Sequence, residues 1–269
     1  MSVASTSLGS TETQFACNTV QQQVSADEWT ARTHLAAAYR LVHLHEMTDL
    51  IYNHITLRIP GTDHLLINAF GFLYNEVCAS NLITVDLQGR IVFAPPNPYE
   101  YGLNEAGIVI HTAVHQARPD AHCVIHTHTR AGMAVSAQAE GLLPLTQSAM
   151  RFDGHCGFHD FEGPAIDTDE QKRLVADLAK HDVMILRNHG LLAVGATAAQ
   201  AFNTMYWLEL ACRAQVDALA GGRELNLPTK PVRDKTARLY QPETRRPFGE
   251  LEWPAMLREL DRHDPSWRL

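Results

Sequence analysis

Two short apolar segments that each end in histidine place the strongest constraint on this chain. One reads CVIHTHT over residues 123–129, and the other reads VMILRNHGLL over residues 183–192. Apolar runs of this length, rich in β-branched residues, are typical of buried strands. Because residues i and i+2 of a strand face the same side, His126 and His128 should project together while Thr127 points away. The sequence therefore predicts a sheet in which two imidazoles share one face.

A third histidine ends the second segment. His189 follows the apolar run, and Gly190 behind it allows a tight turn and a close backbone approach. Catalytic zinc sites use three protein ligands and keep one position open. We therefore expect His126, His128 and His189 to bind one divalent ion, with zinc first and manganese, iron or cobalt as alternatives. Ordinary hydrogen-bonded histidines at strand ends are the simpler alternative.

Other histidines among the 15 in the chain compete for a functional role. His111 and His115 lie four residues apart on an expected helix, but no glutamate of an HExxH motif lies between them. We expect core or supporting positions for that pair. His155 and His159 lie in a glycine-rich segment, where Asp160 could tune the proton affinity of His159.

Composition limits the class of protein. The chain has 269 residues, of which 45% are apolar and 19% are charged, as in an ordinary globular protein with a sizeable core. A formal charge of −8 disfavours nucleic acid and anionic lipid as partners, and no apolar stretch is long enough to span a bilayer. Five cysteines, with no CxxC pair, do not indicate a disulfide framework. With no signal peptide recognised, these features predict a reduced, cytoplasmic protein.

The composition also suggests three parts. Residues 1–24 are rich in Ser, Thr and Gln and lack periodicity, so we expect a flexible N-terminal tail. Residues 25–222 mix strand-like and helix-like segments and predict a single α/β domain, in which residues 142–165 should be irregular. Residues 223–269 shift to Pro, Arg and Glu, which predicts a C-terminal extension able to wrap a neighbouring subunit.

Three segments together resemble a known family. They read HTAVHQARPDAHCVIHTHTRAGMAVSA, FHDFEGPAIDTDEQKRLVADL and VMILRNHGLLAVGATAAQAF. In that order and spacing they are similar to the class II aldolase and adducin head-domain family, from about residue 27 to about residue 220. The resemblance implies a three-layer α/β/α sandwich around a largely antiparallel central sheet. It also implies a homotetramer with active sites between subunits.

The resemblance implies a role for the HxH and NHG motifs. In catalytic members, which include sugar-phosphate aldolases and epimerases, these histidines bind zinc or a similar ion, and they correspond to His126, His128 and His189. The metal holds substrate oxygens and stabilises an enediolate. The implied activity is a lyase that cleaves a C–C bond of a small-molecule substrate by retro-aldol reaction or decarboxylation.

The chain departs from the aldolase pattern at the proton-transfer residue. If the sequence is aligned without gaps from the HxH motif back through His111, the position of the catalytic glutamate of the family falls on Gly107. Glu105 lies two residues away, a rotation of about 200° on a helix. Glu105, His159 and Tyr74, in that order, are the candidate proton shuttles.

The phosphate-binding turn departs as well. The T-P-S-G-like turn of the family corresponds to NAFG, residues 68–71, which lacks the hydroxyl groups. Asn53 in YNHIT matches the asparagine of a G-N-x-S segment and could hold a substrate anion. We therefore expect Asn53, Asn68 and Gly71 to contact a small substrate without a phosphate group.

Two further interpretations stay open. The same three histidines suit iron(II), and some relatives resemble non-haem iron oxygenases that act on 2-oxo acids. A non-catalytic adducin-like assembly module is the other, although cytoskeletal adducins generally lack the full set of histidines that this chain keeps. In either enzyme, Arg151 or Arg187 could bind a substrate carboxylate, with a structural ion pair as the simpler role for each.

Overall fold

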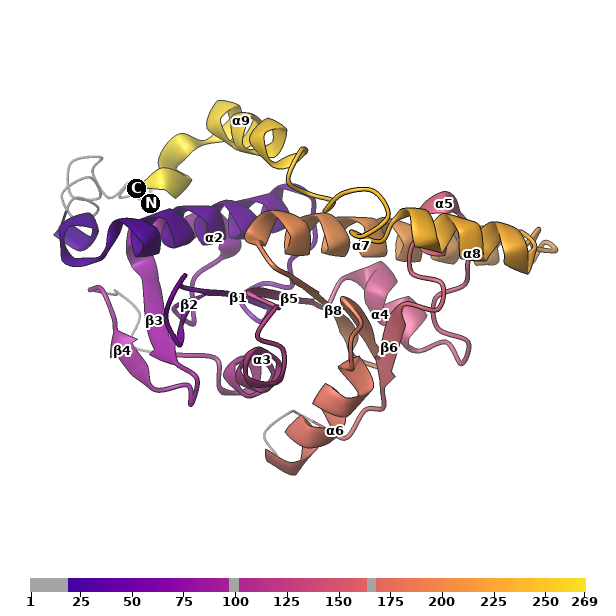
Figure 1. Cartoon of the computed structure of the whole chain (residues 1–269), viewed down its shortest axis with the longest axis horizontal. Coiled ribbons are helices and arrows are strands. Elements are labelled where there is room, and N and C mark those ends of the chain that lie inside the picture. Colours follow the sequence, from indigo (N-terminus) through magenta and orange to yellow (C-terminus); the bar gives the residue numbers. More distant parts are fainter. Residues whose placement is uncertain (1–18, 97–101, 164–167) are drawn as a thin grey trace, which may run out of the picture.

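A single eight-stranded sheet forms the middle layer of the fold (Figure 1). The computed structural model describes residues 19–96, 102–163 and 168–269. Its strands are β1 (His54–Arg58), β2 (His64–Asn68), β3 (Leu82–Asp86), β4 (Ile91–Phe93), β5 (Cys123–Thr127), β6 (Cys156–His159), β7 (Val183–Leu186) and β8 (Gly190–Gly195). They lie in the order β4-β3-β2-β1-β5-β8-β7-β6, and every neighbouring pair is antiparallel except β6 with β7. The largely antiparallel sheet expected from the sequence is confirmed.

Helices cover both faces of the sheet and complete the three expected layers (Figure 1). Two long helices, α2 (Ala26–Leu44) and α7 (Ala198–Ala220), lie on one face with the short α4 (Arg130–Ser136) and α5 (Gln147–Met150). The opposite face carries α3 (Glu105–Ala117) and α6 (Thr168–Leu178). Two 3₁₀ turns, η1 (Tyr74–Glu76) and η2 (Ala79–Asn81), precede β3 and pack against α2.

Successive side chains of the central strands point to opposite faces of the sheet, so they contribute alternately to the two cores beneath the helix layers. In β5, Cys123 and Ile125 belong to the core beneath α2 and α7, whereas Val124 belongs to the core beneath α3 and α6. The Thr127 hydroxyl donates to Met205 Sδ on α7 at 3.4 Å. His126 therefore points toward α3 and α6, as strand geometry requires.

The chain beyond residue 223 folds back on its own domain. It forms α8 (Lys230–Leu239), α9 (Trp253–His263) and η3 (Pro265–Arg268), and α9 crosses the outside of α2 (Figure 1). Trp253, Leu260 and Trp267 are buried in the same core as α2. Within the described subunit, this segment is a helical outer layer.

Two segments differ from the sequence expectation. Residues 142–165 are not irregular throughout, because Cys156–His159 forms β6 and pairs with β7 at the edge of the sheet. Four-residue strands with two glycines nearby carry too weak a periodic signal to be detected. Residues 19–23, expected in the tail, are helical with Val20 buried, and residues 1–18 lie outside the described chain. Within the described ranges, no helix combines the length and apolarity needed to cross a membrane.

Candidate metal centre

Three imidazoles converge at one end of the central strands. His126 lies near the end of β5, His128 just beyond it, and His189 in the turn between β7 and β8. The Nε2 atom of His128 lies 2.7 Å from Nε2 of His126 and 3.0 Å from Nε2 of His189. Among the described residues, these three form the group whose ligand atoms all lie within 4.8 Å of one another. The structure thus brings together the three histidines that the sequence singles out.

Strand geometry and one glycine produce this convergence. Strand β8 pairs directly with β5, so Thr127 lies opposite Leu191 and the turn that carries His189 meets the end of β5. A Cβ atom on Gly190 would lie 2.3 Å from the Thr127 carbonyl oxygen, closer than real Cβ contacts allow. Gly190 therefore permits the approach that places His189 beside His128.

Hydrogen bonds fix the tautomers of two of these imidazoles. Nδ1 of His126 lies 2.9 Å from the Leu191 carbonyl oxygen, and Nδ1 of His128 lies 3.1 Å from Asp49 Oδ2. Both acceptors are oxygens without a proton to give, so each Nδ1 donates, and in the neutral form of each imidazole the lone pair lies on Nε2. Partners of this kind orient metal-binding histidines and raise their basicity.

This donor set fits a divalent cation. The Nε2 atoms of His126 and His128 lie 2.7 Å apart, and in the neutral form set by their Nδ1 bonds both present lone pairs, whose repulsion a cation bound to both nitrogens would offset. Burial lowers the pKa of His126 well below its usual value, and burial with the neighbouring His128 lowers the pKa of His189 to about 4. Both imidazoles are therefore neutral near pH 7, which is the form that binds metal.

A fourth imidazole lies beside the triad. His54 of β1 is the direct cross-strand partner of His126, and their ring centroids are 4.9 Å apart. Its Nδ1 atom lies 2.8 Å from Nε2 of His111 on α3. A Cβ atom on Gly107 would lie 2.5 Å from His54 Cδ2, so the ring fills the space next to the helix position that the family resemblance assigns to glutamate.

Behind His54, a buried chain of hydrogen bonds runs into α3. The Thr56 hydroxyl lies 2.6 Å from Nδ1 of His111 and 2.7 Å from Nε2 of His115. Burial is the main cause that lowers the pKa of His115 to about 3 and the pKa of His111 and His54 well below the usual value. These are neutral, enclosed imidazoles that support β1 against α3.

Sequence reasoning missed His54 because a single histidine inside a strand carries no spacing signal. Two features could have pointed to it. Gly107 stands where the family resemblance places a large side chain, which indicates a vacancy that another group fills. His111 and His115 share one face of a helix, and a polar face that is buried needs polar partners from the sheet.

The three candidate proton shuttles occupy different surroundings. Glu105 is exposed as the first residue of α3. His159 lines a small recess with His189, but its Nδ1 lies 2.8 Å from Asp177 Oδ2 and its Nε2 lies 3.5 Å from Glu170 Oε1. Tyr74 is buried next to α2, edge-on to Tyr39, so its described contacts are with the core and not with the triad.

The candidate substrate-binding residues also differ. Asn53 is buried beside His54; its Oδ1 accepts from the Asp49 amide, and its Nδ2 has no hydrogen-bond partner among the described residues. Asn68 is committed internally, because its Oδ1 accepts from the Tyr39 hydroxyl at 2.7 Å and its Nδ2 donates to the Ala69 carbonyl at 3.0 Å. Gly71 adopts a positive φ of 104° in the turn after β2. Asn53 is thus the member of this set with a spare donor.

The two candidate carboxylate-binding arginines lie in unlike environments. Arg187 forms an ion pair with Asp160 at 3.3 Å and stacks over Phe158 at 5.0 Å, which is the structural role considered for it. Arg151 is buried on the side of α7 that faces the C-terminal segment.

The sequence is similar to known proteins of one family. Residues 33–216 match the family described as Class II Aldolase and Adducin N-terminal domain. A Pseudomonas aeruginosa protein provisionally assigned as a class 2 aldolase is 46% identical over 253 residues, covering 93% of this chain and 96% of that protein. Alpha-adducin of Rattus norvegicus is 41% identical over 244 residues, covering 86% of this chain but 33% of adducin.

Solved structures agree with the sequence relatives. The crystal structure of an aldolase II superfamily protein from Pseudomonas syringae has a TM-score of 0.86 and 46% identity, covering 93% of this chain and 99% of that one. L-Fuculose 1-phosphate aldolase from Glaciozyma antarctica PI12 has a TM-score of 0.79 at 24% identity, covering 91% and 94%. At 24% identity the likeness shows the shared fold alone.

Proposed function

The chain belongs to the class II aldolase and adducin family, and from that premise we propose that it is a divalent-metal-dependent lyase. It would cleave a C–C bond of a small hydroxy- or oxo-carbonyl compound by retro-aldol reaction or decarboxylation. The observation that carries this proposal is the convergence of the three imidazole Nε2 atoms at one strand end.

Each histidine of the triad would supply one ligand nitrogen. His126 and His128 are oriented for this by the Leu191 carbonyl and the Asp49 carboxylate, while His189 is placed by its turn. We favour zinc, with manganese, iron or cobalt as alternatives, since imidazoles accept all of them. A bound ion would supply Lewis-acid stabilisation of negative charge that develops on a substrate oxygen.

Other side chains would hold the substrate and move the proton. The free Nδ2 of Asn53 can donate to a substrate oxygen at a water-poor position, where such a bond discriminates strongly. For proton transfer we retain Glu105 and His159 as candidates and rank Tyr74 last, since it lies in the core. Because the Asn68 amide is already engaged, a substrate without phosphate remains the better expectation.

We further propose a cytoplasmic homotetramer. The family resemblance supports this assembly, and five cysteines with no CxxC pair support a reducing compartment.

Metal analysis of protein purified without a histidine tag or chelator tests the proposal. Wild-type protein should carry about one divalent ion per chain, and His126→Ala, His128→Ala and His189→Ala should each lose most of it, since removing one of three ligands leaves an incomplete site. His122→Ala is the matched control, because His122 lies just before the start of β5, at the end of the strand away from the triad. This variant should keep its full metal content. Unchanged metal content in all three triad variants would exclude this centre.

The similarity to alpha-adducin supports a second candidate, a non-catalytic assembly module. That role predicts folded wild-type protein with metal content near zero under the same gentle purification. A third candidate, an iron(II) oxygenase, predicts oxygen consumption with iron and a 2-oxo acid but none with zinc, so the same preparations separate all three.

A further inference from the structure

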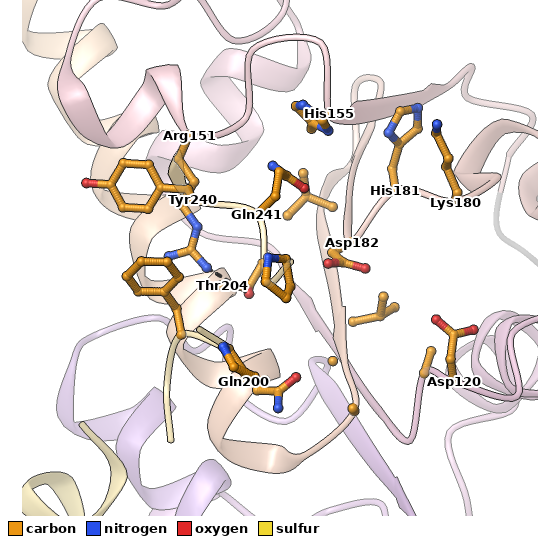
Figure 2. A pocket seen from close by; sticks show the side chains of 18 of the residues that line it. Asp120, Arg151, His155, Lys180, His181, Asp182, Gln200, Thr204, Tyr240 and Gln241 are labelled. Atoms are coloured by element: carbon orange, nitrogen blue, oxygen red, sulfur yellow. Dashed lines mark hydrogen bonds between the residues drawn. The ribbon is translucent and has the colours of Figure 1, made fainter. Parts of the chain in front are cut away.

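A cavity of about 640 Å³ lies at the opposite end of the central strands from the triad. Its walls include the residues that precede β5 and β7 and those that end β8, while the triad lies where β5 and β7 end. The C-terminal segment lines one side through Tyr240 and Gln241 (Figure 2). Phe248 of the same segment also lines the cavity. The volume suits a small organic ligand, and the position separates this cavity from the metal centre.

Arg151 is the most unusual group in its wall. The residue is 9% exposed, and its guanidinium donates to Asn203 Oδ1 at 2.9 Å and to Thr204 Oγ1 at 3.4 Å. Burial is the main cause that lowers its pKa to about 10, so the group stays charged near pH 7. Two neutral acceptors on α7 therefore fix the orientation of a buried cation.

Aromatic rings enclose the same guanidinium. Its Cζ atom lies 5.5, 5.7 and 5.2 Å from the ring centroids of Phe152, Tyr240 and Phe248. Figure 2 shows the Tyr240 ring beside Arg151 and Thr204 near the guanidinium. Cation–π contacts stabilise the charge, but they do not satisfy the remaining N–H donors.

The charges around this cavity are unevenly distributed. Asp120 and Asp182 both lie against Arg118, at 2.7 and 3.4 Å. Arg151, by contrast, has no carboxylate within 4.0 Å in the part of the chain that the structure describes, although Asp182 and Glu252 act on its charge from farther away. Lys180 at the rim likewise has no carboxylate within 4.0 Å among the described residues. Buried arginines are rarely left without an anionic partner, because desolvating a charge is costly.

We propose that this cavity binds a small ligand through a carboxylate or phosphate group that pairs with Arg151. A planar guanidinium with free N–H donors matches either oxyanion bidentately. Asn203 and Thr204 hold it in place beforehand, which lowers the entropic cost of binding. Since Tyr240 and Phe248 belong to the C-terminal segment, the ligand would join this segment to the body of the domain.

Titration calorimetry on the full-length, metal-loaded protein tests the proposal, with inorganic phosphate and succinate as separate probes at constant ionic strength. At least one probe should bind saturably at millimolar concentration, and Arg151→Gln should weaken that binding by about tenfold or more. The probe that binds more tightly identifies the oxyanion class. Absence of saturable binding for both probes, or equal affinity in Arg151→Gln, would overturn the proposal.

Two controls keep the result interpretable. His126→Ala should retain the binding, because loss in that variant would place the probe at the triad and overturn the proposal. If Arg151→Gln does not fold, Lys180→Ala serves instead, since Lys180 is an exposed rim residue whose removal should not unfold the chain. Weakening by about threefold in Lys180→Ala would support the site, and unchanged affinity would count against it.

Discussion

At the scale of single residues, the contact between Gly107 and His54 shows what fills the space at the position where the family resemblance implies a glutamate. His54 cannot simply move away from a side chain at position 107, because His111 holds its Nδ1 at 2.8 Å and His126 lies against its ring. The absence of a side chain at Gly107 and the His54 ring that fills this space thus depend on each other and link α3 to β1.

The first prediction is that Gly107→Ala destabilises the protein although alanine favours helices. The new Cβ atom would meet the His54 ring at 2.5 Å and break its bond to His111. The cost of this clash should exceed the gain of about 1 kcal/mol from the higher helix propensity of alanine. We therefore expect a net loss of about 1–3 kcal/mol in the free energy of unfolding. Urea denaturation at pH 7.5 measures it.

A double variant provides the control for that prediction. His54→Ala removes the ring that the new Cβ would strike, so adding Gly107→Ala to it should cost much less than in the wild-type background. Additive effects of the two substitutions would show that the two residues do not interact.

The second prediction concerns pH and His115. Its pKa lies at about 3 in the folded chain, where burial is the main cause and the nearby Arg58 adds to it, against an ordinary value of 6.5. Below about pH 6.5 the unfolded chain binds a proton that the folded chain does not, so the free energy of unfolding falls as the pH falls. One such histidine removes about 2 kcal/mol by pH 5.

The comparison with His115→Gln isolates this effect. His54 and His111 have lowered pKa values as well and destabilise in the same direction, so the wild-type dependence is steeper than one residue explains. The variant should lose stability more slowly between pH 6.5 and 5, with a difference in slope that rises from about 0.7 to about 1.4 kcal/mol per pH unit across that interval. Parallel curves for wild type and variant would contradict the assignment.

The residues of the triad could be found from sequence, whereas their surroundings could not. Spacing alone places His126 and His128 on one face, and the apolar run before His189 places it at a strand end. The contribution of His54 depends on the pairing of β1 with β5, which joins residues about seventy positions apart and leaves no local pattern. Asp49 and Asn53 lie in a loop whose conformation no periodicity describes.

At the scale of elements, the Tyr39 hydroxyl joins α2 to the two strands beneath it. It accepts from the Ile55 amide at 3.0 Å and from the Asn68 amide at 3.2 Å, and it lies 2.5 Å from the Ile55 carbonyl oxygen. This hydroxyl therefore serves backbone groups where β1 and β2 separate.

The third prediction follows from that position. Tyr39→Phe would leave two buried amides without an acceptor, so we expect a loss of about 1–3 kcal/mol in the free energy of unfolding. Tyr74→Phe is the matched control, because Tyr74 is equally buried and lies edge-on to Tyr39, but its hydroxyl has no partner among the described residues. Thermal unfolding of both variants should show a loss for Tyr39→Phe alone.

Elements were predictable where periodicity or composition was strong. The buried strands β5 and β7 and the helix α3, which carries His111 and His115, were expected close to their observed positions. Strand β6 was missed because it has four residues, and the helices beyond residue 223 were missed because Pro and Arg obscure a short apolar pattern. Their positions depend on tertiary contacts with β7, α5 and α2.

At the scale of the whole molecule, the C-terminal segment completes the core that the domain leaves open. The Arg40 guanidinium pairs with Asp264 at 2.9 Å, and the Ser80 amide donates to the Leu269 carbonyl at 2.8 Å. The same segment supplies Tyr240 and Phe248 to the cavity around Arg151. These contacts of the C-terminal segment lie away from the triad, so a variant can change the stability of the fold without changing metal binding.

The fourth prediction uses this separation. Trp267 is fully buried at the end of the chain, so Trp267→Ala should lower the free energy of unfolding by about 3–5 kcal/mol. Trp207→Ala is the matched control, because Trp207 is 36% exposed on α7 and should cost less than about 1 kcal/mol. Both variants should keep wild-type metal content under native conditions, since neither tryptophan contacts a triad histidine. Loss of metal from folded Trp267→Ala would instead mean that the C-terminal segment holds the strand ends in place, and that the metal centre depends on the outermost layer of the fold.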